Sequence, residues 1–125
     1  MITTEKSNRS MLRHRFETVD EFWPYYVREH SQPLNRTLHF IGNTNLLFWL
    51  LIALTKRSLR LTIFAVVSSY LFAWTGHFLV EKNKPATFDY PILSALADMR
   101  MYKKMLDGTM DAELAKYLDN LNMAL

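Results

Sequence analysis

The stretch LTIFAVVSSYLFAWTGHFLV, residues 61–80, contains no charged side chain. A helix needs about 20 predominantly apolar residues to cross the hydrocarbon core of a bilayer, and this run meets that length. A histidine, His77, nevertheless lies near its end, and one helical turn later the chain places a carboxylate, Glu81. Because polar groups are costly in an apolar span and tend to be functional, the stretch predicts both a membrane-type helix and a site.

A second apolar block precedes this run. Residues 37–54, TLHFIGNTNLLFWLLIAL, are solidly apolar in their second half, and the short basic segment TKRSLR (55–60) separates the two blocks. Two long apolar helices with a short connection predict an antiparallel helical hairpin. We therefore expect an all-α fold, a small helical bundle built around a transmembrane hairpin. The alternative is a hairpin buried in the core of a soluble bundle.

Shorter helices are expected on both sides of the hairpin. The segment TVDEFWPYYVREH begins with Thr18 and has Glu21 three residues later, which is the capping-box pattern that starts a helix. Further helices are predicted over residues 92–106, which Gly108 would end, and over residues 111–123. We found no strand candidate longer than a few residues.

Length and composition limit the classes of protein that remain. A chain of 125 residues is expected to form one domain, with a flexible basic tail at residues 1–15 and a helical domain at residues 16–125. The absence of cysteine excludes disulfides and thiolate metal sites, so a metal would need His, Asp or Glu ligands. The net charge is only +3 and no nucleic-acid-binding motif is recognisable, so the expected partner is membrane lipid and not nucleic acid.

The hairpin geometry brings histidines to one end. His39 and His77 each lie 19 residues from Ser58 in the connecting segment, so both are expected roughly 28 Å from the turn. His30 precedes His39 across a short link that contains a proline, and it should lie near the same end. Three imidazoles with open positions suit Fe(II) or Zn(II). Glu81 could be a fourth ligand, or it could fix the tautomer of a ligand histidine.

Ordinary explanations also exist for these residues. Each histidine could be a satisfied core residue, and the carboxylate of Glu81 could pair with a neighbouring cation, Lys82, Lys84 or Arg100.

The residues around the histidines form an ordered pattern, Y-x-x-x-H, then N-x-x-x-H-x-x-G, then G-H-x-x-x-E-x-x-x-P-A. Its members are Tyr26, His30, Asn35, His39, Gly42, Gly76, His77, Glu81, Pro85 and Ala86. Over roughly residues 16–106 this pattern resembles a family long catalogued as a small membrane domain of unknown function. Fungal members of that family act as 2-hydroxy fatty acid dioxygenases in phytosphingosine breakdown.

The resemblance implies an Fe(II)-dependent dioxygenase of lipid metabolism. Such an enzyme uses molecular oxygen to shorten a 2-hydroxy fatty acid by one carbon through α-oxidation, with the redox chemistry supplied by the metal. By this resemblance His30, His39 and His77 would be the iron ligands. Glu81 and Asn35 would support those ligands or contact the substrate.

Other features complete the expectation. Arg36 or Lys82 could pair with the substrate carboxylate, and the acyl chain would lie between the apolar helices. The chain departs from the fungal pattern in being shorter and in carrying Ala73 where a glutamine is expected.

The expected location is an integral membrane position, in a bacterial inner membrane or an endomembrane. The alternative function is a non-enzymatic small membrane protein that scaffolds partners or binds a metal or haem, with His39 and His77 as axial haem ligands.

Overall fold

The computed structural model describes residues 15–124, with side chains described as far as Leu118. The expected basic tail of residues 1–15 therefore lies, apart from Arg15, outside the described residues. Within the described range all regular structure is helical, which confirms the all-α fold class.

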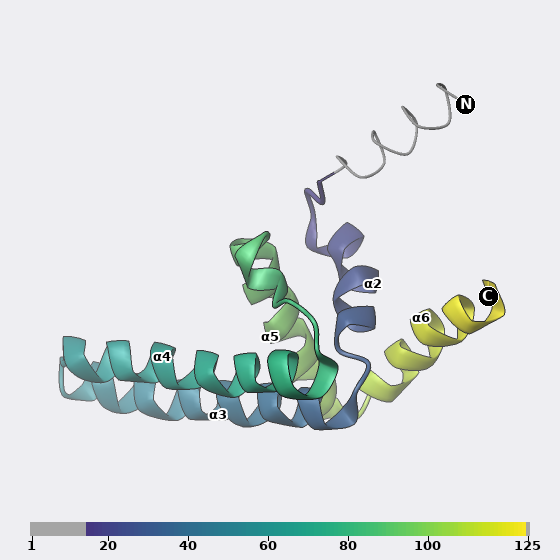
Figure 1. Ribbon diagram of the computed structural model, residues 1–125. Helices are drawn as coiled ribbons and strands as arrows, with labels where there is room; N and C mark the ends of the chain where they lie inside the picture. Colours follow the sequence, from purple (N-terminus) through teal and green to yellow (C-terminus); the bar gives the residue numbers. More distant parts are fainter. Residues whose placement is uncertain (1–14, 125) are drawn as a thin grey trace, which may run out of the picture.

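The predicted hairpin consists of α3 (Pro33–Thr55) and α4 (Leu59–Thr75), which run antiparallel and side by side (Figure 1). The helix of α4 continues without a break into a π-helical segment, η1 (Gly76–Glu81). Gly42 allows the two helices to approach closely, because a Cβ atom there would lie 3.0 Å from the main-chain oxygen of Ser69.

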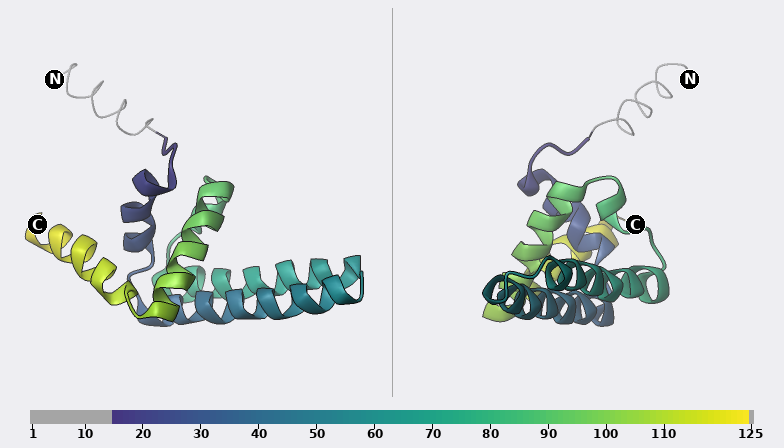
Figure 2. Two further views of the ribbon diagram at one scale, coloured as in Figure 1. Left: turned by 180° about the vertical axis from the view of Figure 1, so that it is seen from behind. Right: turned by 90° about the vertical axis from the view of Figure 1, so that its left-hand side faces the viewer.

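Three further helices form a head at one end of the hairpin: α2 (Val19–Glu29), α5 (Pro91–Asp107) and α6 (Met110–Ala124). Figures 1 and 2 show that α2 and α5 rise steeply from the axis of the hairpin, so the molecule has an angular shape. A short 3-10 helix, η2 (Ala86–Phe88), precedes α5. The main hydrophobic core lies inside this head and includes Phe22, Trp23, Tyr26, Val27, Ala97, Met101, Met110 and Leu114.

Local signals in the sequence position the ends of the helices. The Thr18 side chain accepts a hydrogen bond from the main-chain N–H of Glu21 at 3.2 Å, as the capping box predicts. The Glu21 carboxylate reaches back to the N–H of Glu17, one residue earlier than that pattern requires. Gly108 ends α5 with a φ of 78°, a left-handed conformation that glycine adopts without strain.

The hairpin leaves most of its apolar surface uncovered. Both α3 and the continuous helix from Leu59 to Glu81 are long and apolar enough to cross a membrane, by length and composition. Only 22% of the residues in the most apolar window of each helix are buried. Large side chains that are between 46% and 73% exposed follow both helices: Leu47, Leu51, Leu54, Ile63, Val67 and Leu71.

Replacing Phe22 by alanine tests where the core lies. Phe22 is fully buried at the centre of the head, so the substitution should lower the free energy of unfolding by about 3–5 kcal/mol. The matched control Phe48→Ala removes a half-exposed ring on α3 and should change this free energy by less than about 1 kcal/mol. Denaturant titration in detergent, followed by circular dichroism, measures both. Equal losses in the two variants would contradict this location of the core.

Candidate metal centre

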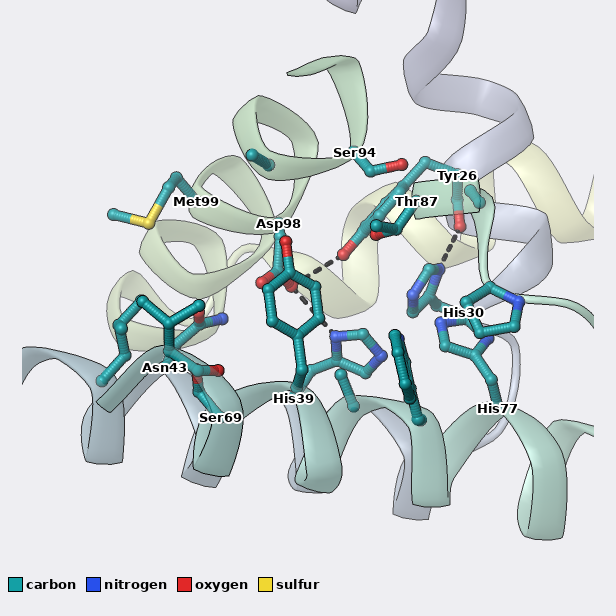
Figure 3. Close-up of a pocket in the computed structure, with 18 residues that line it drawn as sticks. Tyr26, His30, His39, Asn43, Ser69, His77, Thr87, Ser94, Asp98 and Met99 are labelled. Carbon is teal, nitrogen blue, oxygen red and sulfur yellow. Dashed lines mark hydrogen bonds and ion pairs between the residues drawn. The ribbon is translucent and has the colours of Figure 1, made fainter. Parts of the chain in front are cut away.

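The structure brings three histidines from three different elements into contact. His30 is the C-cap of α2, His39 lies on α3, and His77 lies in η1. Their ring centroids are 4.5 to 5.0 Å apart and the rings are close to perpendicular to one another. All three are buried, and one nitrogen from each lies within 4.8 Å of the other two (Figure 3).

The Nδ1 atoms of His30 and His39 each face an oxygen atom that accepts a hydrogen bond, a main-chain carbonyl in one case and a carboxylate in the other. His30 Nδ1 donates to the main-chain oxygen of Tyr26 at 2.6 Å, and His39 Nδ1 donates to Oδ1 of Asp98 at 3.0 Å. The Tyr26 hydroxyl donates to the same Asp98 oxygen at 2.8 Å. Burial, together with the neighbouring Asp98 carboxylate, raises the pKa of Tyr26 well above its usual range. Tyr26 therefore stays protonated, and Asp98 acts as an acceptor toward both groups.

His77 obtains its acceptor through irregular backbone. The π-helical turn begins at Gly76, and Lys82 ends it in the left-handed conformation, with a φ of 58°. The chain then turns back, so that Oδ1 of Asn83 accepts from His77 Nδ1 at 2.8 Å. The Asn83 amide group donates to the main-chain oxygen and to Oε2 of Glu29, which fixes the side of the amide that faces the imidazole. Turns of this π type occur frequently at functional sites.

Because each Nδ1 is a donor, the Nε2 lone pairs remain for a metal ion. The Nε2 atoms of His30 and His39 are buried without a hydrogen-bond partner among the described residues. Burial lowers the pKa of His30 well below its usual range, and the adjacent His39 and His77 lower it further, so His30 is neutral. Neutral imidazoles fixed in this tautomer by hydrogen bonds at their other nitrogen are the usual metal-binding form. The residues therefore fit an ion such as Fe(II) or Zn(II).

Glu81 and Asn35, which the sequence also placed in the site, contact each other beside the imidazoles. The Glu81 carboxylate accepts hydrogen bonds from Ser31 Oγ at 3.1 Å, from the Gln32 main-chain N–H at 2.5 Å and from Asn35 Nδ2 at 3.4 Å. These bonds join η1 to the link between α2 and α3. A Cβ atom at Gly76 would collide with Oδ1 of Asn35 and lie 2.9 Å from its Cγ, so only glycine leaves room for this contact.

Arg36 and Lys82, the two cations that could have paired with a substrate carboxylate, lie outside the cavity beside the histidines. Nη1 of Arg36 donates to the main-chain oxygens of His30 and Ser31, at 2.8 and 2.7 Å, and so holds the same link. The Lys82 side chain is exposed where the chain turns after η1. Neither residue lines the cavity beside the histidines.

That cavity has a volume of about 250 Å³ and lies between the hairpin and α5 (Figure 3). All three histidines and Asp98 line it, and no lysine or arginine does. The rest of the lining includes the apolar side chains of Leu46, Val66, Ala73 and Met99. The cavity therefore joins a cluster of imidazoles to an apolar space.

Sequence reasoning did not identify Asp98 and Asn83. Asp98 lies on α5, in the middle of a helix whose spacing indicated only packing, and Asn83 sits in a loop next to two lysines. The sequence did contain one sign that Asp98 has a special role: it is an acidic residue within a helix whose predicted packing face is apolar, with Leu93, Leu96, Ala97 and Met101.

Comparison with known proteins agrees with the resemblance seen in the sequence. A family model described as 2-hydroxy-palmitic acid dioxygenase Mpo1-like matches residues 16–110, a range that contains the three histidines, Asp98 and Asn83. No curated protein and no solved structure matches the chain.

Removing the Nδ1 acceptors should weaken metal binding without removing a ligand. Asp98→Ala and Asn83→Ala should each lower the affinity for Zn(II) by about 10- to 100-fold, because the imidazole they orient becomes free to rotate or to change tautomer. The control Asp111→Ala removes an exposed carboxylate on α6 and should leave the affinity unchanged. Competition with a chromophoric chelator measures all three variants, and unchanged affinity in both test variants would contradict their role.

Proposed function

The chain belongs to the Mpo1-like family of 2-hydroxy-palmitic acid dioxygenases, and we propose that it is an Fe(II)-dependent dioxygenase that shortens a 2-hydroxy fatty acid by one carbon. The observation that carries this proposal is the convergence of three buried imidazoles, with their Nδ1 atoms occupied, at one end of an apolar cavity. Iron held there would supply the redox chemistry with molecular oxygen.

The proposed reaction needs no other cofactor. Conversion of RCH(OH)COOH and O₂ into RCOOH, CO₂ and H₂O balances in atoms, and the substrate supplies all the electrons that reduce the oxygen. The bond between C1 and C2 breaks, C1 leaves as CO₂, and C2 becomes the new carboxyl carbon. A small domain without a nucleotide- or flavin-binding motif is therefore sufficient for this chemistry.

The protein's own residues would hold the metal ion and orient the imidazole rings that bind it. His30, His39 and His77 would bind the ion through Nε2, while Asp98 and Asn83 keep two of the three rings in the tautomer that makes this possible. The hydroxyl and carboxylate of the substrate would face the ion. Because no lysine or arginine lines the cavity, the negative charge of the acid has no other cation to balance it there.

The apolar end of the cavity suits the acyl chain. Leu46 on α3, Val66 on α4 and Met99 on α5 lie on its lining, so a hydrocarbon chain would leave the histidines between the hairpin and α5. Glu81 would support the ligands through the link that carries His30, because it accepts a hydrogen bond from Gln32 in that link, and Asn35 would hold the same carboxylate.

We further propose that the hairpin is inserted in a membrane, in a bacterial inner membrane or an endomembrane. Its large apolar side chains are exposed along both helices, and burying such surface in lipid is favourable. On α5, Ile92 and Leu96 are further exposed apolar side chains, at 75% and 52%. A lipid-soluble substrate could then reach the cavity from the bilayer.

Membrane insertion predicts the result of fractionation. The wild-type chain should stay with the membranes after an alkaline carbonate wash. Leu47→Arg and Leu71→Arg together should release it, because both are exposed positions near the centre of a span, where each arginine costs about 2.5–3.5 kcal/mol. The control Leu106→Arg places the same charge on an exposed position of the head and should not release the chain. A wild-type chain that fractionates as a soluble monomer would contradict insertion.

The alternative of a non-enzymatic metal or haem protein has less support. The rings of His39 and His77 are 5.0 Å apart, but His30 packs against both of them at 4.6 and 4.5 Å. Three imidazoles in mutual contact leave no flat space for a porphyrin between two of them. A non-enzymatic binder of a single metal ion remains the competitor to test.

Turnover separates these functions. Fe(II)-loaded protein incubated with 2-hydroxypalmitate and oxygen should form pentadecanoate and CO₂ and consume one equivalent of O₂, while palmitate should not react. Chelator-treated protein and the His77→Ala variant should be inactive. Mass spectrometry and an oxygen electrode measure the outcome. Iron-loaded protein that leaves 2-hydroxy acids of several chain lengths unchanged would contradict the oxygenase and favour the non-enzymatic metal protein.

A further inference from the structure

The proposed reaction leaves two buried polar side chains of the cavity without a role. Asn43 on α3 is 7% exposed and Ser94 on α5 is 5% exposed, and both line the cavity. Neither Asn43 Nδ2 nor Ser94 Oγ has a hydrogen-bond partner among the described residues. A buried donor without a partner lowers stability, so each of these groups indicates that a ligand supplies the missing hydrogen bond.

Other asparagine and serine side chains, on the two helices of the hairpin, have hydrogen-bond partners. Asn45 donates to the hydroxyl of Ser68 at 2.7 Å. The hydroxyl of Ser69, which also lines the cavity, donates to the main-chain oxygen of Val66 at 2.9 Å. The free atoms of Asn43 and Ser94 are therefore a property of their positions and not of helical polar residues in general.

Both side chains lie close to the histidine cluster. Asn43 is one helical turn after His39 on α3, and Ser94 is one turn before Asp98 on α5, so they face the cavity from different helices (Figure 3). The indole nitrogen of Trp74 is a third buried donor without a partner on the lining. Neutral donors thus surround the space beside the imidazoles, where no basic side chain is present.

We propose that Asn43 and Ser94 hydrogen-bond the oxygen atoms of a 2-hydroxy acid head group and so select 2-hydroxy acids over plain fatty acids. This inference rests on the proposed function. A plain fatty acid lacks the hydroxyl, and its binding would leave a buried donor unpaired. Sites built around a substrate hydroxyl reject analogues without one for this reason.

Equilibrium binding to the Zn(II)-loaded chain tests the proposal, since zinc has no redox chemistry and the ligand is not consumed. Titration calorimetry in detergent would compare 2-hydroxypalmitate with palmitate. Asn43→Leu and Ser94→Ala should each weaken binding of 2-hydroxypalmitate by about tenfold and reduce its advantage over palmitate. The control Ser69→Ala removes a hydroxyl from the same cavity that is already bonded to the backbone, and it should bind both ligands as the wild type does.

Thermal unfolding of the metal-free variants separates ligand contact from a structural role. Removing an unpaired buried group does not remove a native contact, so Asn43→Leu and Ser94→Ala should be at least as stable as the wild type. Lower stability in both would overturn the proposal, as would unchanged affinity or an equal loss for both ligands. Zn(II)-loaded wild type that does not bind 2-hydroxypalmitate would overturn this inference together with the proposed function. If the wild type binds 2-hydroxypalmitate and both variants bind it with the same affinity, this inference alone would be overturned.

Discussion

Each imidazole of the cluster is held through its Nδ1 atom by an acceptor outside the cluster, and the rest of the site depends on this. The acceptors are a main-chain oxygen of α2, the carboxylate of Asp98 on α5 and the amide of Asn83 after η1. One nitrogen of each buried histidine then lies within 4.8 Å of the other two, and buried nitrogens without partners, such as Nε2 of His30 and His39, are costly. One cation would satisfy them together. The cluster therefore needs both the head and the hairpin, because neither part alone contains all three histidines and their acceptors.

The irregular segments keep these elements in register. A regular helix through residues 76–83 would leave Asn83 well beyond His77, whereas the π turn and the left-handed Lys82 bring its amide back to the ring. On the other side, Arg36 and Glu81 hold the link between His30 and α3 by hydrogen bonds to its main chain. Residues that look catalytic in the sequence thus position the backbone from which the histidines extend.

The sequence predicted the parts of this structure that follow from periodicity and length. The hairpin, the helix boundaries near Thr18 and Gly108, and the common level of His39 and His77 all follow from helical geometry and capping chemistry. The contacts of Asp98 and Asn83 could not be predicted, because they depend on how α5 crosses the hairpin and on a change of helix type. A spacing of four residues put Glu81 on the face of His77 for an α-helix, and the wider π turn directs it to the link instead.

X-ray absorption spectroscopy of the Fe(II)-loaded chain in detergent, combined with metal analysis, would show whether the three histidines bind one ion. We expect one iron per chain with the scattering pattern of three imidazole ligands. We also expect the iron to be lost when His30, His39 and His77 are all replaced by alanine in a chain that keeps its helical circular dichroism. Iron bound without imidazole scattering, or retained at full occupancy in that variant, would contradict a shared histidine site.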